Sequence, residues 1–92
     1  MKYIVKYTNP YKRDYKRMEK RGENMELLDS VIDLLRKGKP LPEKYCDHAL
    51  VGNYKGSREC HVKPNWLLIY RVYEDVLVLV LMQTGTHSDL FR

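Results

Sequence analysis

The hydrophobic pattern divides the chain into a helical first half and a strand-like second half. Alternation over residues 2–7 predicts a first strand. Asn9, as the cap before Pro10 at the first helical position, and Asn24 then mark the starts of two helices, and glycines at 22 and 38 mark their ends. The expected apolar stripes are Tyr11, Tyr15 and Met18 in the first helix, and Leu27, Leu28, Val31, Ile32, Leu34 and Leu35 in the second.

From Leu50 onward, turn residues separate short segments that are typical of strands. These segments either alternate between apolar and polar residues or are rich in β-branched residues. The expected strands are residues 57–63, 67–73 and 76–82. In the first of these runs, alternation points Cys60 toward the core and His61 away from it. Residues 1–92 are therefore expected to form a single α+β domain in β-α-α-β-β-β order, with two helices packed on a mainly antiparallel sheet of four to five strands.

Positive charge is concentrated at the start of the chain. The formal net charge is +5, yet the residues through Arg21 carry eight bases against two acids, a net +6, so the remainder carries −1. This asymmetry favours a polyanionic partner, first a nucleic acid and second an acidic protein or a membrane surface. A solvated basic helix face explains the charge equally well.

The cysteines and apolar runs exclude several classes of protein. Nothing resembles a secretory signal, and residues 76–82 are too short to span a bilayer, so a reduced cytoplasmic chain is expected. A zinc site is disfavoured because its possible ligands have unsuitable spacing, namely Cys46, His48, Cys60 and His61. Residues 52–56 lack the strand-loop-helix context of a phosphate-binding loop, and no cofactor is expected.

Three histidines, His48, His61 and His87, lie at polar junctions beside turns. Any one of them alone is more simply a surface residue, but together in one cleft they suit acid-base chemistry near neutral pH. Such a set suits metal-free cleavage of RNA, in which the 2′-OH attacks the adjacent phosphorus. Candidate phosphate and base contacts are Arg58, Lys63, Arg71, Trp66 and Phe91, although a core position explains Trp66 about as well.

Over nearly its whole length, the sequence resembles the YafQ branch of the RelE-type bacterial toxins. The resemblance rests on ordered motifs: Pro40-Leu41-Pro42-Glu43-Lys44-Tyr45, Asp47-His48-Ala49-Leu50, Gly52-Asn53-Tyr54-Lys55-Gly56, Arg58-Glu59-Cys60-His61, Pro64-Asn65-Trp66-Leu67-Leu68-Ile69-Tyr70 and Gly85-Thr86-His87-Ser88-Asp89-Leu90-Phe91. It implies a RelE-like fold and an mRNA interferase of a type II toxin–antitoxin pair, which cuts the codon displayed in the ribosomal A site.

The resemblance also implies roles for individual residues. His48, His61 and His87 match the catalytic histidines of the family, Trp66 its neighbouring aromatic residue and Phe91 the terminal aromatic residue that helps hold mRNA. Asn65 departs from the aspartate of the family, and an amide cannot accept a proton as a carboxylate base does. Either a histidine is the base, or Asn65 only orients RNA and activity is reduced.

We therefore hypothesise that His87 is a general acid or base, with His48 and His61 as its counterpart and phosphate contacts. The basic first helix is expected to contact ribosomal RNA through Lys12, Lys16 and Lys20. A cognate antitoxin is the expected protein partner, and operator DNA a partner only of the toxin–antitoxin complex. The alternatives are a catalytically impaired RNA- or ribosome-binding module, and a DNA-binding co-repressor acting with its antitoxin.

Overall fold

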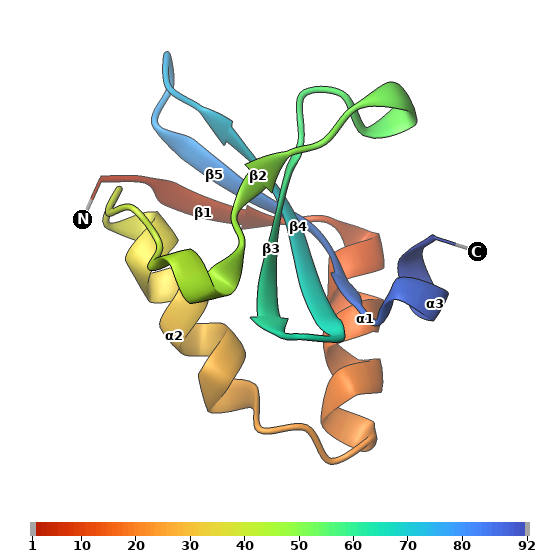
Figure 1. The fold of residues 1–92 in the computed structure, drawn as a ribbon. Coiled ribbons are helices and arrows are strands. Elements are labelled where there is room, and N and C mark those ends of the chain that lie inside the picture. Colours follow the sequence, from red (N-terminus) through yellow and green to blue (C-terminus); the bar gives the residue numbers. More distant parts are fainter. Residues whose placement is uncertain (1, 92) are drawn as a thin grey trace.

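The computed structural model describes residues 2–91, which form three helices and a five-stranded sheet (Figure 1). In chain order the elements are β1 (Ile4–Tyr7), α1 (Asn9–Lys20), α2 (Met25–Arg36), the 3₁₀ turn η1 (Glu43–Tyr45), β2 (His48–Ala49), the 3₁₀ turn η2 (Gly52–Tyr54), β3 (Arg58–Lys63), β4 (Trp66–Tyr73), β5 (Val78–Gly85) and α3 (His87–Leu90). The predicted α+β class is confirmed. Across residues 2–91, no helix is both long enough and apolar enough to cross a membrane.

The two long helices begin at capping side chains. The N-cap of α1 is Thr8, whose Oγ1 accepts the Tyr11 N–H at 3.0 Å, so the prediction that Asn9 caps this helix is wrong by one residue. Asn24 caps α2 as expected, accepting the Glu26 N–H at 3.1 Å. Gly22 and Gly38 follow the two helices with φ of 87° and 75°, a left-handed backbone that glycine adopts at little cost.

The sheet has the strand order β1-β5-β4-β3-β2, with β1 parallel to β5 and every other pair antiparallel. The expected last strand, residues 76–82, is shifted toward the C-terminus. Val76 and Leu77 are exposed turn residues, because reversal of the chain between β4 and β5 uses residues 74–77 and puts Leu77 at φ 52°. The apolar segment of the sequence therefore begins before the strand β5 does, and its first residues belong to the turn.

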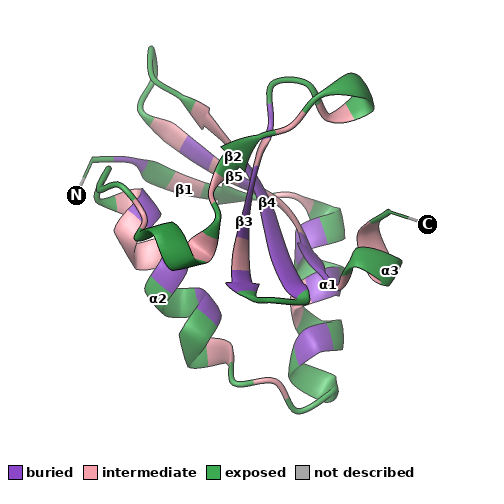
Figure 2. Ribbon diagram, viewed as in Figure 1, coloured by how far each residue is buried: buried purple, intermediate pink, exposed green. Residues whose placement is uncertain are grey.

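Both long helices cover one face of the sheet (Figure 1), and Figure 2 shows the buried residues on their inner sides and along β4. The core joins Tyr11 and Met18 of α1 and Leu28, Val31 and Leu35 of α2 to Cys60, Val62, Trp66, Leu68, Tyr70, Leu79 and Leu81 of the sheet. Because Cys60 and Val62 face the helices, strand alternation places Glu59 and His61 on the opposite, open face. The expected stripe of α2 is wider than the observed one, since Leu27 is 40% exposed.

Candidate active site

A continuous row of aromatic rings starts on the open face of the sheet. The ring centroids of His48 and His61 are 6.4 Å apart, and those of His61 and His87 are 5.9 Å apart. Phe91 follows at 6.3 Å from His87, and Tyr54 at 5.3 Å from Phe91. Residues from β2, β3, α3 and η2 therefore converge, including all three histidines that the sequence singled out.

Backbone carbonyls fix the orientation of two of these imidazoles. His48 Nδ1 lies 2.7 Å from the Cys46 carbonyl oxygen, and His61 Nδ1 lies 3.2 Å from that of Pro64. A carbonyl oxygen only accepts hydrogen bonds, so each Nδ1 carries the proton and donates it. In the neutral rings, Nε2 is then left with a free lone pair, which is the form that a general base requires.

Glu59 of β3 is a site residue that sequence reasoning missed. Its side chain is 7% exposed, and its Oε1 lies 3.5 Å from Nε2 of both His48 and His61. A carboxylate there can pair with either ring once that ring has taken a proton. The available signal was strand alternation, which already placed Glu59 on the face of His61.

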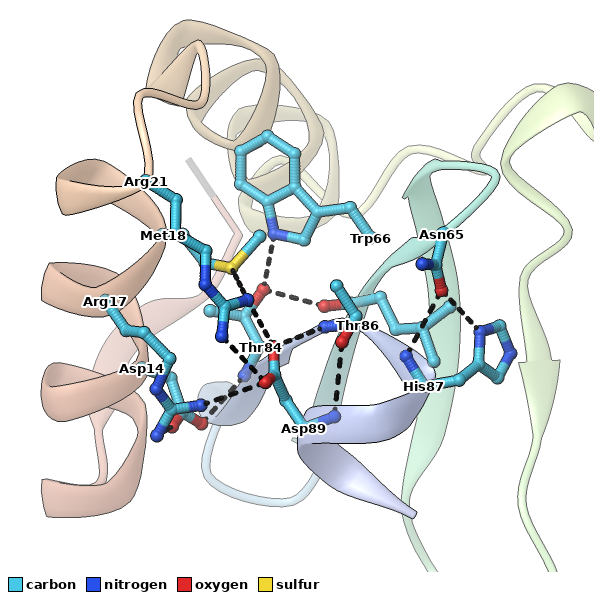
Figure 3. Close-up of polar contacts among 11 residues, drawn as sticks. Asp14, Arg17, Met18, Arg21, Asn65, Trp66, Thr84, Thr86, His87 and Asp89 are labelled. Atoms are coloured by element: carbon cyan, nitrogen blue, oxygen red, sulfur yellow. Dashed lines mark hydrogen bonds and ion pairs between the residues drawn. The ribbon is translucent and has the colours of Figure 1, made fainter. Parts of the chain in front are cut away.

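Asn65 holds the third imidazole. Its Oδ1 lies 3.0 Å from His87 Nδ1 and 3.3 Å from the His87 backbone nitrogen, and it accepts a hydrogen bond from each (Figure 3). His87 therefore has the same tautomer as the other two rings, with Nε2 unprotonated in its neutral form. An amide oxygen accepts these bonds as a carboxylate would, although it cannot take the proton.

The short helix α3 that carries His87 is fastened to α1. Thr86 and Asp89 form a capping box, in which each side chain accepts the backbone N–H of the other. The Asp89 carboxylate also accepts two hydrogen bonds from the Arg21 guanidinium, at 2.7 and 2.9 Å (Figure 3). Chiefly for that reason, the pKa of Asp89 lies well below its usual value. The sequence did not predict this helix or its attachment.

Beneath α3, a buried polar network links α1 to β5. The Asp14 carboxylate accepts the Thr84 N–H at 3.1 Å and pairs with Arg17 at 3.2 Å, while burial raises its pKa. Thr84 Oγ1 donates to the Leu67 carbonyl at 2.7 Å and accepts the Trp66 indole N–H at 2.9 Å.

This network places Trp66 in the core, with 1% of its surface exposed. The expectation that Trp66 stacks on RNA is therefore not met in this structure, and its alternative, a core aromatic residue, is correct. A buried indole N–H needs a hydrogen-bond acceptor, and here the Thr84 hydroxyl provides it. The sequence does not reveal which residue will accept this bond.

The three candidate phosphate contacts have different surroundings. Arg58 pairs with Asp47 at 3.2 Å on the helix-covered face, and Lys63 pairs with Glu23 at 3.1 Å. Arg71 has no carboxylate partner within residues 2–91 and instead donates to Ser57 Oγ at 2.9 Å and to the Lys55 carbonyl at 3.0 Å. Among these three, Arg71 is thus the cation left to meet an external phosphate.

The lysines of α1 are exposed but stand apart from the histidine row. Lys12 and Lys16 line a groove of about 860 Å³ between α1, α2 and β1, on the helix-covered side of the sheet. Lys20 lies at the exposed end of the same helix. These residues form a separate basic surface.

The cysteines are both free, and burial raises the pKa of the Cys60 thiol, so neither a disulfide nor a reactive thiolate forms at Cys60. Within residues 2–91, the histidines, cysteines and carboxylates form no group of three or more that is arranged to hold a metal ion. The chemistry that the ring row can perform is proton transfer by imidazole, with the Glu59 carboxylate beside two of the rings.

Comparison with known proteins gives consistent matches across the chain. The family model described as "Bacterial toxin of type II toxin-antitoxin system, YafQ" matches residues 3–92. The mRNA interferase toxin YafQ of Escherichia coli K12 is 40% identical over 88 residues, covering 95% of this chain and 94% of the relative.

Two solved structures share the fold over its full extent. YafQ from E. coli BL21(DE3) superposes with a TM-score of 0.92 at 35% identity, covering 98% of this chain and 99% of that one. A chain of the E. coli DinJ–YafQ toxin–antitoxin complex superposes with a TM-score of 0.90 at 38% identity, covering all of both chains.

Proposed function

The chain belongs to the YafQ family of bacterial toxins of type II toxin–antitoxin systems, and on that premise we propose that it is an mRNA interferase, an endoribonuclease that cuts mRNA in the ribosomal A site. The observation that carries the proposal is the row of three imidazoles, His48, His61 and His87, whose Nδ1 atoms all donate to fixed oxygens. Three pre-oriented Nε2 atoms are then available for proton transfer.

In the proposed reaction, one imidazole Nε2 takes the proton of the RNA 2′-OH. The 2′-oxygen attacks the adjacent phosphorus, and the bond to the 5′-oxygen breaks as that oxygen receives a proton from a second, protonated imidazole. The products are a 2′,3′-cyclic phosphate and a free 5′-OH. The proposed steps use neither a metal nor a cofactor.

We assign one proton-transfer role to His87 and the other to the pair His48 and His61. Glu59 supports this assignment because it lies 3.5 Å from both Nε2 atoms of the pair and can stabilise an imidazolium there. Asn65 serves as a positioning residue, and Phe91 provides an exposed aromatic face for a base.

A catalytically impaired RNA-binding module is the main alternative. Asn65 was its motivation, since the family resemblance implies an aspartate at that position. The amide oxygen nevertheless holds the His87 ring by the bond that a carboxylate would make. This interaction favours a working endoribonuclease.

The proposed partners are an antitoxin, mRNA on the ribosome, and ribosomal RNA at Lys12, Lys16 and Lys20. The E. coli YafQ that shares this fold is found in a complex with DinJ, which supports an antitoxin for this chain. Operator DNA is proposed as a ligand of the toxin–antitoxin complex only. The proposed location is the cytoplasm, where the ribosome-bound substrate lies.

Replacement of the imidazole of His87 tests the proposed chemistry. We expect His87→Gln to slow cleavage of ribosome-bound mRNA by about 10²- to 10⁴-fold, because glutamine hydrogen-bonds but does not transfer protons. Single-turnover primer extension measures the rate. Cleavage at the wild-type rate would show that His87 has no role in proton transfer.

Two controls separate chemistry from binding. Ribosome binding by His87→Gln should equal that of the wild type, and mRNA with a 2′-deoxynucleotide on the 5′ side of the scissile phosphate should resist the wild-type protein. Cleavage of the deoxy substrate would contradict attack by the 2′-oxygen.

A further inference from the structure

A cavity of about 400 Å³ adjoins the row of rings, on the open side of the sheet. Its lining comes from the start of α1, the η2 loop and strands β4 and β5, and includes Tyr54, Asn53, Ser57, Ile69, Arg71 and Gln83. The volume falls within the range of about 300–1,000 Å³ that is usual for small-molecule sites. None of the residues proposed for proton transfer lines it.

Tyr54 connects this cavity to the proposed active site. Its ring packs edge-on against Phe91 with centroids 5.3 Å apart, and its hydroxyl donates to the Leu90 carbonyl of α3 at 3.3 Å. The ring row that begins at His48 therefore ends at the wall of the cavity. The rings of Phe91 and Tyr54 thus lead from His87 to the cavity.

The polar groups of the cavity are unused within the described chain. The side-chain amides of Gln83 and Asn53 make no hydrogen bond to any of residues 2–91, although Gln83 is half-buried. An amide offers a donor and an acceptor side by side, which is the complement of a base edge. Both amides are therefore free to hydrogen-bond a ligand in the cavity.

Arg71 supplies the charge. Its guanidinium is held by Ser57 Oγ and the Lys55 carbonyl through Nε and Nη2, and it has no carboxylate partner within residues 2–91. A guanidinium fixed in this manner is suited to a phosphate oxygen. Base-reading amides, an aromatic wall and one oriented cation are together the contacts that a nucleotide requires.

We propose that this cavity binds a nucleotide next to the scissile phosphate, with Gln83 and Asn53 reading its base and Arg71 contacting its phosphate. The proposal rests on the proposed endoribonuclease function and deepens it, because it assigns sequence preference to residues outside the histidine row. It predicts that base choice and cleavage chemistry can be altered separately.

A direct binding experiment exploits the fact that the sequence contains a single glutamine, Gln83. Selective ¹⁵N labelling of glutamine side chains gives one amide pair, which we expect to shift saturably on titration with 2′-deoxy trinucleotides, which lack the attacking hydroxyl. An amide pair that does not move up to millimolar trinucleotide overturns the proposal. A shift caused by the antitoxin but not by the trinucleotide would assign the cavity to the protein partner and also overturn it.

Cleavage of a ribosome-bound mRNA library with randomised codons measures preference. We expect Gln83→Leu to flatten the preference at one position of the codon by about 10-fold, since an amide pair to a base discriminates by about 1–3 kcal/mol. The matched control is Asn9→Leu, which removes an exposed amide outside the cavity lining and should keep the wild-type preference. An unchanged preference in Gln83→Leu contradicts the proposal.

The two proposals fail in distinguishable ways. If the trinucleotide shifts the Gln83 amide but the wild-type protein cuts no mRNA, the nucleotide site stands and the endoribonuclease function is wrong. If the wild-type protein cuts mRNA but Gln83 neither shifts nor affects preference, the function stands and the nucleotide site is wrong.

Discussion

At the scale of single residues, the proposed site depends on polar atoms that accept hydrogen bonds from imidazole. The carbonyl oxygens of Cys46 and Pro64 and the amide oxygen of Asn65 each accept a hydrogen bond from one imidazole Nδ1–H. Their common effect is to present Nε2 of three histidines in one row. Nothing in the amino-acid types alone specifies this, because two of the three acceptors are backbone atoms.

Replacing Glu59 tests whether its charge supports proton transfer. We expect Glu59→Gln to reduce single-turnover cleavage by about 10-fold or more, the equivalent of losing a charge-assisted bond of about 1.5–3 kcal/mol. The amide keeps the size of the side chain, so ribosome binding should be unchanged.

Glu43→Gln is the matched control, since Glu43 is exposed in η1 and should tolerate the same change. Equal cleavage rates for Glu59→Gln and Glu43→Gln would remove Glu59 from the proposed mechanism.

At the scale of elements, α3 has too few residues to be stable alone and depends on its attachment to α1. The capping box and the Arg21–Asp89 pair provide that attachment. Since His87 is the first residue of α3, the placement of its ring follows from the docking of this helix.

Asp89→Asn should lower the free energy of unfolding by about 1 kcal/mol at neutral pH, because the charge-assisted bonds from Arg21 are weakened. The pKa of Asp89 is depressed in the folded state from its ordinary 3.8, so its contribution is fully present above that value. The contribution declines as the pH falls below 3.8. Urea unfolding of both proteins at about pH 7 and about pH 3 measures the difference, which should shrink at the lower pH.

Asp75→Asn makes the same change at an exposed residue of the turn between β4 and β5, and controls for the loss of a surface carboxylate. If the free energies of unfolding of the wild type and Asp89→Asn differ by the same amount at both pH values, the charge of Asp89 does not stabilise the attachment to Arg21.

Several elements were predictable and others were not, for physical reasons. The helix boundaries near Asn24, Gly22 and Gly38 follow from local capping chemistry, so the sequence predicts them closely. The pairing of β1 with β5 joins residues more than seventy positions apart and has no local signal. The burial of Asp14 likewise depends on a partner, Thr84, in a distant strand.

At the scale of the whole molecule, Lys12 and Lys16 of α1 line a groove beside α2 and β1, whereas the histidine row starts on the open face of the sheet. The convergence of the histidines was predicted, but their separation from the lysines of α1 requires the three-dimensional arrangement. We propose different tasks for these two surfaces, namely proton transfer at the histidine row and electrostatic attachment at the lysines.

Neutralising Lys12, Lys16 and Lys20 together by substitution with glutamine should weaken ribosome binding and reduce its salt dependence. Removing one lysine–phosphate ion pair lowers the slope of log affinity against log salt by about 0.7–0.9. Binding is measured by sedimentation with ribosomes over a range of potassium concentrations. The cleavage rate at saturating protein should remain near that of the wild type.

A triple glutamine variant at Lys37, Lys39 and Lys44 removes the same charge from exposed positions outside α1. If the salt slope falls equally in both triple variants, net charge rather than the α1 surface governs attachment.

Because the first strand, β1, pairs with the last strand, β5, the toxin can complete its sheet only when nearly the whole chain is present. A fragment that stops before Val78 lacks the neighbour of β1, the strand that anchors Asp14 through Thr84, and His87 itself. Such fragments, whether from interrupted synthesis or from proteolysis, can complete neither the sheet nor the row of imidazoles. A cell that makes or degrades this protein is therefore exposed to its harm only from chains that have kept both β1 and β5.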